Sequence, residues 1–406
     1  MAEQAKVPAI RFAGFTDPWE QRKFGELYRP VSEKNDVSFG RDKAISVANM
    51  YFNPAVYVTE DSYLATYNVM RLGDIAFEGN RSKRFAHGRF VENTIGDGIV
   101  SHVFKVFRHV GDNYDLSYWK HAINNEKLMK DVLTRSTKAS TMMHELVTAD
   151  FLEELTLVPS LNEQRAIGAA IDSIDNLITL HQRKYDKLVV FKKSMLEKMF
   201  PKDGESVPEI RFAGFTDPWE QRKLEDIANR VTRKNEGESD LPLTISSQYG
   251  LVDQRTFFNN QVASKDMSGY YLLRKGEFAY NKSTSGDSPW GAVKRLVRYE
   301  KGCVSTLYIC FGLDGADPDF LVTYYETDRW YKAVQMIAAE GARNHGLLNI
   351  APNDFFDTAL ILPPSREEQE LIGLFFARLD NLITLHQRKL ELLQNIKKSL
   401  LDKMFV

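Results

Sequence analysis

Two stretches of the chain place apolar residues on a strict four-three spacing, which is the pattern of a helix that packs against another helix. The seam positions of the first stretch are Ile167, Ile171, Ile174, Ile178, His181, Tyr185 and Leu188. Those of the second are Ile372, Phe376, Leu379, Ile383, His386, Leu390 and Leu393. No proline interrupts the 37 residues from 163 to 199, so the pattern predicts helices ~55 Å long at 1.5 Å per residue.

Short motifs predict where helices begin. Ser160 to Glu163 and Ser365 to Glu368 read as capping boxes, in which the serine and the glutamate satisfy free backbone N–H groups. Asp17 to Glu20 and its copy at 217 to 220 also read as helix starts, because aspartate can cap and proline suits the first helical position.

Four leucines, Leu177, Leu180, Leu382 and Leu385, flank the two seams and are expected to widen the apolar surface. The rest of the chain is mixed, with β-rich runs, glycine turns and a late helix at 125 to 133 and again at 330 to 340. We therefore predict an α+β protein with two mixed α/β domains and two long helices that form an antiparallel coiled coil with pseudo-two-fold symmetry.

The chain is an internal duplication. The thirteen residues from Arg11 to Lys23 recur unchanged as Arg211 to Lys223, and the ten from Asp175 to Lys184 recur as Asp380 to Lys389. Residues 192 to 200 match 397 to 405 with two conservative changes, and their separation is the same as that between 175 and 380. The predicted parts are a first domain at 1–158, a first helix at 159–203, a second domain at 204–362 and a second helix at 363–406.

Between the identical blocks the two halves have diverged, but a skeleton remains. Residues 67 to 77 parallel 270 to 280, and 98 to 101 parallel 302 to 305, each followed by a strand-like run. One scaffold with two different surfaces is expected of modules that read different targets. Neutral drift is the alternative, although drift alone does not leave the framing blocks unchanged.

The composition is that of an ordinary globular protein: 406 residues, 43% hydrophobic, with a formal net charge of −2. Near-zero charge argues against a general electrostatic binder of nucleic acid, so such a function needs local basic patches. Cys303 and Cys310 are too few for a disulfide framework or a zinc site. No apolar run is long enough to span a membrane, the first residues lack the apolar core of a signal peptide, and we expect a cytoplasmic protein.

Two long helices in one chain most simply pack on each other as an antiparallel pair. His181 and His386 then fall near the middle of the seam. A polar seam residue can fix the register, and two histidines without carboxylate or cysteine partners make a poor metal site. We predict no metal site, and in a symmetric pairing His181 lies opposite Leu390.

The order of variable domain, capped helix, second variable domain and second helix resembles the specificity subunit of type I restriction-modification enzymes. The blocks at 12–23, 159–164 and 192–200, each present twice, carry the resemblance over essentially the whole chain. It implies two target-recognition domains that each read one half of a split, asymmetric DNA sequence. It also implies that the helices set the gap, that two methyltransferase subunits binding S-adenosylmethionine dock on them, and that restriction subunits join the complex.

Candidate contacts to double-stranded DNA are basic or polar loops, because arginine reads guanine, asparagine reads adenine and lysine holds phosphates. In the first domain they are Asn80, Arg81, Lys83, Arg84, His87, Arg89, Arg135 and Lys138. In the second they are Lys282, Ser283, Thr284, Arg343, Asn344 and His345. For each of them a solvated surface loop is the alternative.

No glycine-rich nucleotide loop and no catalytic triad or metal cluster stands at recognisable spacing. We therefore expect a non-catalytic chain with no cofactor of its own. Two rival hypotheses stay open: a methyltransferase or nuclease with unrecognised motifs, and a coiled-coil scaffold whose domains bind proteins.

Overall fold

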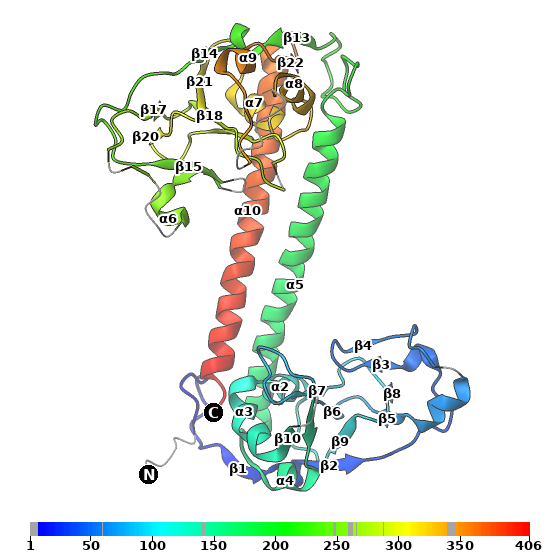
Figure 1. Cartoon of the computed structure of the whole chain (residues 1–406). Helices are drawn as coiled ribbons and strands as arrows, with labels where there is room; N and C mark the ends of the chain where they lie inside the picture. The colour runs from blue at the N-terminus through cyan, green and yellow to red at the C-terminus, as the bar shows by residue number, and fades with distance from the viewer. Residues whose placement is uncertain are drawn as a thin grey trace. The chain divides into compact units, whose positions relative to one another are not determined.

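The computed structural model describes residues 7–58, 60–139, 143–246, 249–258, 263–264, 266–286, 288–338 and 346–406. The chain divides into two compact units (Figure 1). The first comprises Met1–Gln182 with Arg388–Val406, and the second comprises Arg183–Gln387. Because this division cuts across both long helices, the functional boundaries at 158, 203 and 362 stay a prediction.

A four-stranded antiparallel sheet in the order β2-β9-β6-β7 forms the centre of the first unit. The elements outside the long helices are β1 (Glu20–Lys23), α1 (Phe24–Leu27), β2 (Tyr28–Val31), η1 (Arg41–Lys43), β3 (Ile45–Ser46), β4 (Tyr51–Phe52), η2 (Asp61–Thr66), β5 (Asn68–Met70), β6 (Ile75–Glu78), β7 (Arg89–Glu92), β8 (Gly98–Val100), β9 (Lys105–His109), α2 (Leu116–Ala122), α3 (Glu126–Ser136), β10 (Thr137–Ala139), β11 (His144–Leu146), α4 (Thr148–Glu153) and β12 (Leu155–Val158).

Strand β6 is buried along its whole length because both faces of the sheet are covered. Ile75 and Phe77 face a core that includes Phe107 and Phe151, whereas Ala76 faces a second, smaller core with Val106. This alternation follows from the two-residue period of a strand. The sheet is therefore held from both sides, which fixes the loops at its ends.

The second unit repeats this plan with a sheet in the order β14-β21-β18-β19. Its elements are β13 (Glu220–Lys223), η3 (Leu224–Asp226), β14 (Ala228–Arg230), β15 (Leu243–Ser246), β16 (Gly250–Asp253), α6 (Gln254–Phe258), β17 (Tyr271–Arg274), β18 (Phe278–Asn281), β19 (Ala292–Arg295), β20 (Lys301–Val304), β21 (Ile309–Leu313), α7 (Pro318–Tyr324), α8 (Tyr331–Ile337), α9 (Pro352–Phe356) and β22 (Ala359–Leu362).

The skeleton predicted for the divergent regions is confirmed. β5 pairs with β8 and β6 with β9 in the first unit, and the parallel segments pair as β17 with β20 and β18 with β21 in the second. The predicted late helices are confirmed as α3 and α8. The helices α2 and α7 were not predicted from the sequence.

The prediction of a helix start at Asp17 and at Asp217 is wrong. Residues 20–23 form β1, which pairs with β12 just ahead of the first long helix, and 220–223 form β13, which pairs with β22 in the same way. Trp219, Leu224 and Ile227 are buried in the core of the second unit. The segments 20–23 and 220–223 are strands because β12 and β22 each offer an unpaired edge. A short segment that pairs with such an edge satisfies its backbone N–H and C=O groups with a ladder of hydrogen bonds.

The long helices are α5 (Leu161–Lys198) and α10 (Arg366–Lys403), each of 38 residues (Figure 1). Ser160 caps α5 weakly, with its Oγ 3.4 Å from the N of Glu163. The prediction that the Glu163 carboxylate caps the helix is wrong. That carboxylate instead accepts hydrogen bonds from Arg11 Nε at 2.6 Å and Arg11 Nη2 at 2.7 Å.

The Glu163 side chain is only 1% exposed and also accepts a hydrogen bond of 3.1 Å from Trp19 Nε1. Arg211 and Glu368 form the same bidentate pair in the second unit, at 2.6 and 2.8 Å. The duplicated block at 11–23 thus ties the start of each helix to its own domain.

The end of each long helix is buried in the core of the unit that contains it. In the first unit Phe405, at the end of α10, stacks on Tyr118 with ring centroids 5.4 Å apart, and Ile10 N donates to Lys403 O at 3.0 Å. In the second unit Phe200, at the end of α5, packs on Trp219 with centroids 5.7 Å apart. Each core is therefore completed by a helix end that comes from the other half of the duplication.

The two helices run antiparallel within each unit. Lys397 Nζ of α10 lies 2.6 Å from Asp175 Oδ1 of α5 in the first unit, and Lys192 Nζ lies 2.5 Å from Asp380 Oδ1 in the second. The two ion pairs occupy equivalent places in the duplicated helices, which makes the pairing symmetric. The position of His181 opposite Leu390 stays a prediction.

The most buried seam residues lie in the first part of each helix, and Leu390 is buried as well. Ile167, Ile171, Ile372, Phe376, Leu379 and Leu390 are buried, whereas Ile174, Ile178, His181, Tyr185, Leu188, Ile383, His386 and Leu393 are half-buried. The expectation that the flanking leucines widen the seam is wrong, since Leu177, Leu180, Leu382 and Leu385 are 44–46% exposed. Two helices cover only one stripe of each other, so these four side chains remain in solvent.

We expect Arg11→Met to destabilise the first unit by about 3 kcal/mol, because it leaves the buried Glu163 carboxylate without its counter-ion. Urea unfolding with hydrogen–deuterium exchange read at β1 and β12 measures this. Lys23→Met is the matched control, since it breaks an exposed pair with Glu153 and should leave exchange unchanged. Equal protection in both variants would contradict the anchoring role of Arg11.

Candidate nucleic-acid interface

The basic loop of the first unit joins β6 to β7 and has a defined shape. Gly88 has φ +78°, and a Cβ there would lie 2.5 Å from Glu78 O. A Cβ on Gly79 would lie 2.1 Å from His144 O, and His144 N donates to Gly79 O at 2.8 Å. Only glycine fits at these two positions, so the base of the loop is fixed against β11.

The tip of this loop presents its cations to solvent. Asn80, Arg81, Lys83 and Arg84 are exposed. Ser82 and Phe85 close the turn through two hydrogen bonds of 3.0–3.1 Å. Phe85 supports Arg84, whose guanidinium lies 5.1 Å from the ring centroid. Phe85 was not singled out from the sequence, although an aromatic residue among cations is a usable signal for nucleic-acid binding.

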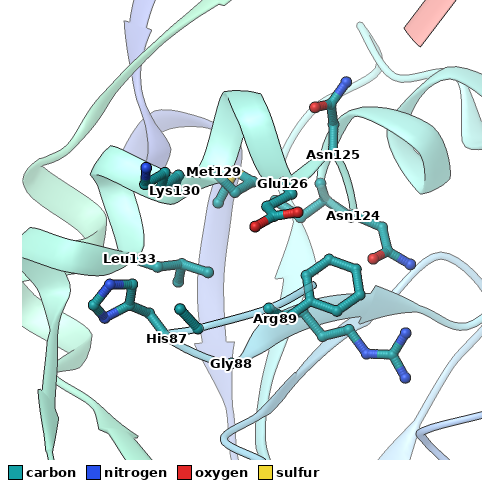
Figure 2. A pocket seen from close by; sticks show the side chains of 12 residues that line it. His87, Gly88, Arg89, Asn124, Asn125, Glu126, Met129, Lys130 and Leu133 are labelled. Carbon is teal, nitrogen blue, oxygen red and sulfur yellow. The ribbon is translucent and has the colours of Figure 1, made fainter. Parts of the chain in front are cut away.

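Arg89 and His87 have supporting positions instead. Arg89 donates to Glu78 Oε2 at 2.7 Å and to Ala48 O at 2.6 Å. The ring of His87 packs on that of His144, with centroids 4.9 Å apart. Figure 2 shows both side chains at a pocket that is closed on its other side by α3, with Asn124 beside Arg89. Both residues therefore hold the loop in place.

The second predicted segment of this unit is partly brought to the loop. Asn80 forms a β-bridge with Met143, and Lys138 lies exposed on β10, which pairs with β11 beside that bridge. Arg135 is engaged elsewhere, with its guanidinium bound to Glu154 at 2.6 and 2.8 Å. The structure therefore groups Lys138, and not Arg135, with the exposed cations of the loop.

The hairpin β18–β19 has the same construction in the second unit. Gly291 has φ +80°, and a Cβ there would lie 2.3 Å from Asn281 O. Ser283 forms a β-bridge with Leu347, so this loop also lies against the segment that follows the late helix. The predicted contacts Arg343, Asn344 and His345 lie outside the described residues.

Two side chains of the second loop make hydrogen bonds to the backbone of the segment that packs against it. Lys282 is half-buried, donates to Ile350 O at 3.3 Å, and has its pKa lowered by burial. The Thr284 hydroxyl donates to Gly346 O at 3.0 Å. Ser283 is exposed. One scaffold thus carries a cationic tip in the first unit and a neutral hydroxyl-bearing tip at 283–286 in the second.

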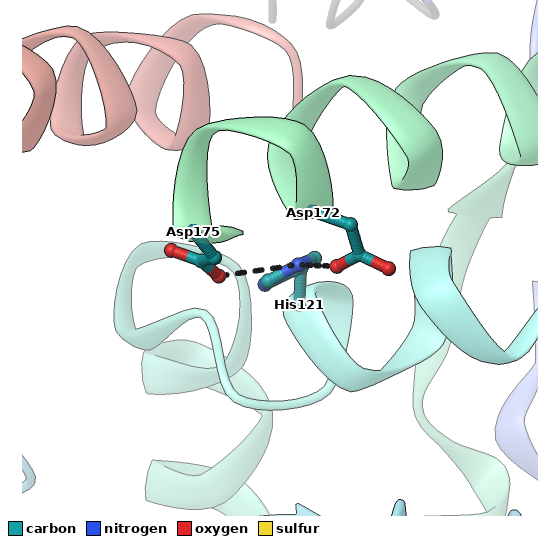
Figure 3. Close-up of side chains that lie close together, drawn as sticks. All are labelled: His121, Asp172 and Asp175. Carbon is teal, nitrogen blue, oxygen red and sulfur yellow. Dashed lines mark hydrogen bonds and ion pairs between the residues drawn. The ribbon is translucent and has the colours of Figure 1, made fainter. Parts of the chain in front are cut away.

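His121, Asp172 and Asp175 form the group of possible metal ligands in the described part of the chain (Figure 3). His121 Nε2 lies 3.1 Å from Asp172 Oδ1. Lys120 lies 2.5 Å from Asp172, and Lys397 lies 2.6 Å from Asp175. Both carboxylates are thus balanced by lysines, which favours a role in joining α2, α5 and α10, and burial lowers the pKa of His121. The absence of a metal stays a prediction.

No family model matches the chain, and no curated protein matches it either. Among solved structures, the S subunit of the type I restriction-modification system from M. genitalium matches with a TM-score of 0.54 and 12% identity, over 98% of this chain and 99% of that one. The chain has the fold of a type I specificity subunit. The resemblance of the sequence motifs is therefore confirmed for the fold.

Two further structures match with lower TM-scores. The HsdS subunit from Thermoanaerobacter tengcongensis matches at 0.48 with 16% identity, over 97% of this chain and 98% of that one. A chain from a study of the assembly and conformational transition of the type I R-M system matches at 0.43 with 16% identity, over 95% and 97%. Of the helices that the structure describes, none is long and apolar enough to cross a membrane.

The exposed and the engaged arginines of this specificity-subunit fold should behave differently on substitution. We expect the triple change Arg81→Gln, Lys83→Gln and Arg84→Gln to leave thermal stability unchanged and to reduce the salt slope of DNA binding by up to ~2.7, at ~0.9 per phosphate contact. Arg135→Gln is the control, because its pair with Glu154 lies outside the loop. Binding isotherms on duplex DNA at several salt concentrations decide this, and a slope changed only by Arg135→Gln would contradict it.

Proposed function

We propose that this chain is the non-catalytic specificity subunit of a type I restriction-modification complex and recognises an asymmetric, bipartite DNA target. The observation that carries the proposal is the pair of hairpins β6–β7 and β18–β19. A glycine just before the second strand, Gly88 or Gly291, shapes both hairpins, and the two loops present different side chains. Two domains that recognise different half-sites would need one scaffold with different side chains at the tip.

The chemistry of the two tips supports unlike half-sites. The first tip carries Arg81, Lys83 and Arg84, which suit guanine edges and phosphates, together with Asn80, which suits adenine. The second tip carries the exposed hydroxyl groups of Ser283 and Ser285, which can donate to or accept from base edges. The two domains would therefore read different sequences, and the long helices would set the number of base pairs between them.

The exposed leucines of the helices support a protein partner. Leu177 and Leu180 belong to the ten-residue block that recurs unchanged with Leu382 and Leu385. All four are 44–46% exposed and take little part in the seam. Exposed apolar side chains often mark a protein-binding surface. Because these are identical in both copies, we infer that each helix binds one copy of the same partner. We assign them to two methyltransferase subunits, which would hold S-adenosylmethionine, and restriction subunits would join that complex.

The decisive experiment maps methylated adenines in a host that lacks adenine methylation. The chain is expressed with the methyltransferase subunit of its own system, and the methyltransferase alone is the control. We expect methylation at one asymmetric bipartite motif that disappears without this chain. Purified chain that methylates or cuts DNA by itself would establish the enzyme hypothesis instead.

The same experiment also distinguishes the proposed function from the hypothesis of a protein-binding scaffold. A stable complex with the methyltransferase that binds DNA with no sequence preference would contradict the reading of half-sites. The absence of any complex would favour a scaffold for other proteins.

Substituting the four leucines tests the partner surface. Changing Leu177, Leu180, Leu382 and Leu385 to Gln should reduce co-purification of the methyltransferase at least tenfold, because burying a leucine contributes about 1.5–3 kcal/mol. Val190→Gln is the control: Val190 is 70% exposed on α5, but its counterpart in the other copy is Asn395. Equal loss in both variants would contradict a specific site, and the folded fraction is followed by circular dichroism.

A further inference from the structure

A groove in the second unit lies between the second half of α5 and the hairpin β18–β19. It is lined by Lys192 and Lys193 of the helix, Lys294 of β19, Ser288 and Gly291 of the loop before β19, and Trp330 and Tyr331 at the start of α8. Three lysines from two elements thus face one hollow, which Glu326 also lines and which borders the candidate DNA loop.

The lysines differ in how far they are neutralised. Lys192 Nζ lies 2.5 Å from Asp380 and 2.7 Å from Glu326. Burial disfavours its charge, but these two carboxylates raise the pKa of Lys192 overall. Lys294 lies 3.9 Å from Glu326, which it shares with Lys192. Lys193 is exposed and makes no ion pair within the described ranges. The groove therefore keeps an excess of positive charge beside Lys193 and Lys294.

The groove continues directly into the loop that carries the candidate base contacts. Ser288 and Gly291 belong to the same connection as Ser283 and Thr284. That loop lacks an exposed cation of its own between 283 and 286, and Lys282 donates to a backbone carbonyl. A duplex read by this loop would therefore need a backbone anchor from another element.

The first unit differs at the same places. Its helix carries the identical pair Lys397 and Lys398. The position of Lys294, opposite Ala279, is taken by Val91, opposite Ala76. Its exposed cations stand at the loop tip instead. The two units therefore distribute positive charge in opposite ways around one scaffold.

We propose that Lys193 and Lys294 together hold one phosphate group of the DNA backbone beside the half-site read by the second unit. This inference rests on the proposed function. Phosphate contacts fix the position of a protein on DNA without reading sequence. The spacer helix would in this way contribute to binding as well as to spacing, and the anchor would be specific to the second unit.

The test compares DNA binding by the full chain across salt concentrations, on a duplex that carries the mapped bipartite target. We expect the double variant Lys193→Met, Lys294→Met to lose ~0.9 from the salt slope, which corresponds to about fivefold weaker binding near 0.15 M salt. Sequence preference should not change. Lys301→Met is the control, because Lys301 is an exposed lysine on β20 of the same unit that does not line the groove.

The charge-keeping variant Lys193→Arg, Lys294→Arg should retain the slope even where the methionine variant folds poorly. A slope equal to that of the unchanged protein in the methionine variant would overturn the proposal. So would weaker co-purification of the methyltransferase with unaltered DNA binding, since the groove would then be a protein contact. If no target can be mapped, the proposed function fails first, whereas an unaltered slope on a mapped target refutes the groove alone.

Discussion

The burial of each helix end in a core built by the other half of the duplication is the constraint on which this structure depends. Phe405 completes the core around Tyr118, and Phe200 completes the core around Trp219. Removing a buried phenylalanine costs about 3–5 kcal/mol, a large fraction of the stability of a domain. The first compact unit is therefore not a continuous piece of sequence, and each unit needs a helix end from the other copy.

This exchange explains why the framing blocks stayed identical while the domains diverged. The block at 11–23 and its copy supply the arginine that holds the buried glutamate at each helix start, and the block at 192–200 and its copy supply the helix end that enters a core. A change in one block would have to be matched in another segment far away in the sequence. The hairpin tips have no such partners beyond their own support, so they were free to change.

The candidate site shows how far residue types can be interpreted without a fold. The basic loop at 79–90 was found from its composition, but sequence could not separate its exposed cations from its supporting ones. Arg81 and Arg89 are the same residue type in the same loop, yet Arg89 is bound to Glu78 and to the backbone. Lys282 is likewise turned to a carbonyl. Arg89 is held by Glu78, its neighbour across the hairpin, and by Ala48, while Lys282 is held by Ile350 from outside its hairpin. The composition of a loop does not show which of its cations has such a partner.

The sequence by itself determined the duplication, the two long helices, their antiparallel pairing and the matching skeletons of the two domains, because these features rest on repetition and on local periodicity. Only the tertiary structure decided that residues 20–23 form a strand and that Glu163 binds Arg11 instead of capping its helix. It also decided that the flanking leucines stay in solvent and that Lys193 and Lys294 share a groove. The physical reason is common to these cases. Each depends on a partner more than 90 residues away in the sequence, or on the absence of one. The conformation of a short segment and the contacts of a side chain are set by the groups that lie next to it in the folded chain.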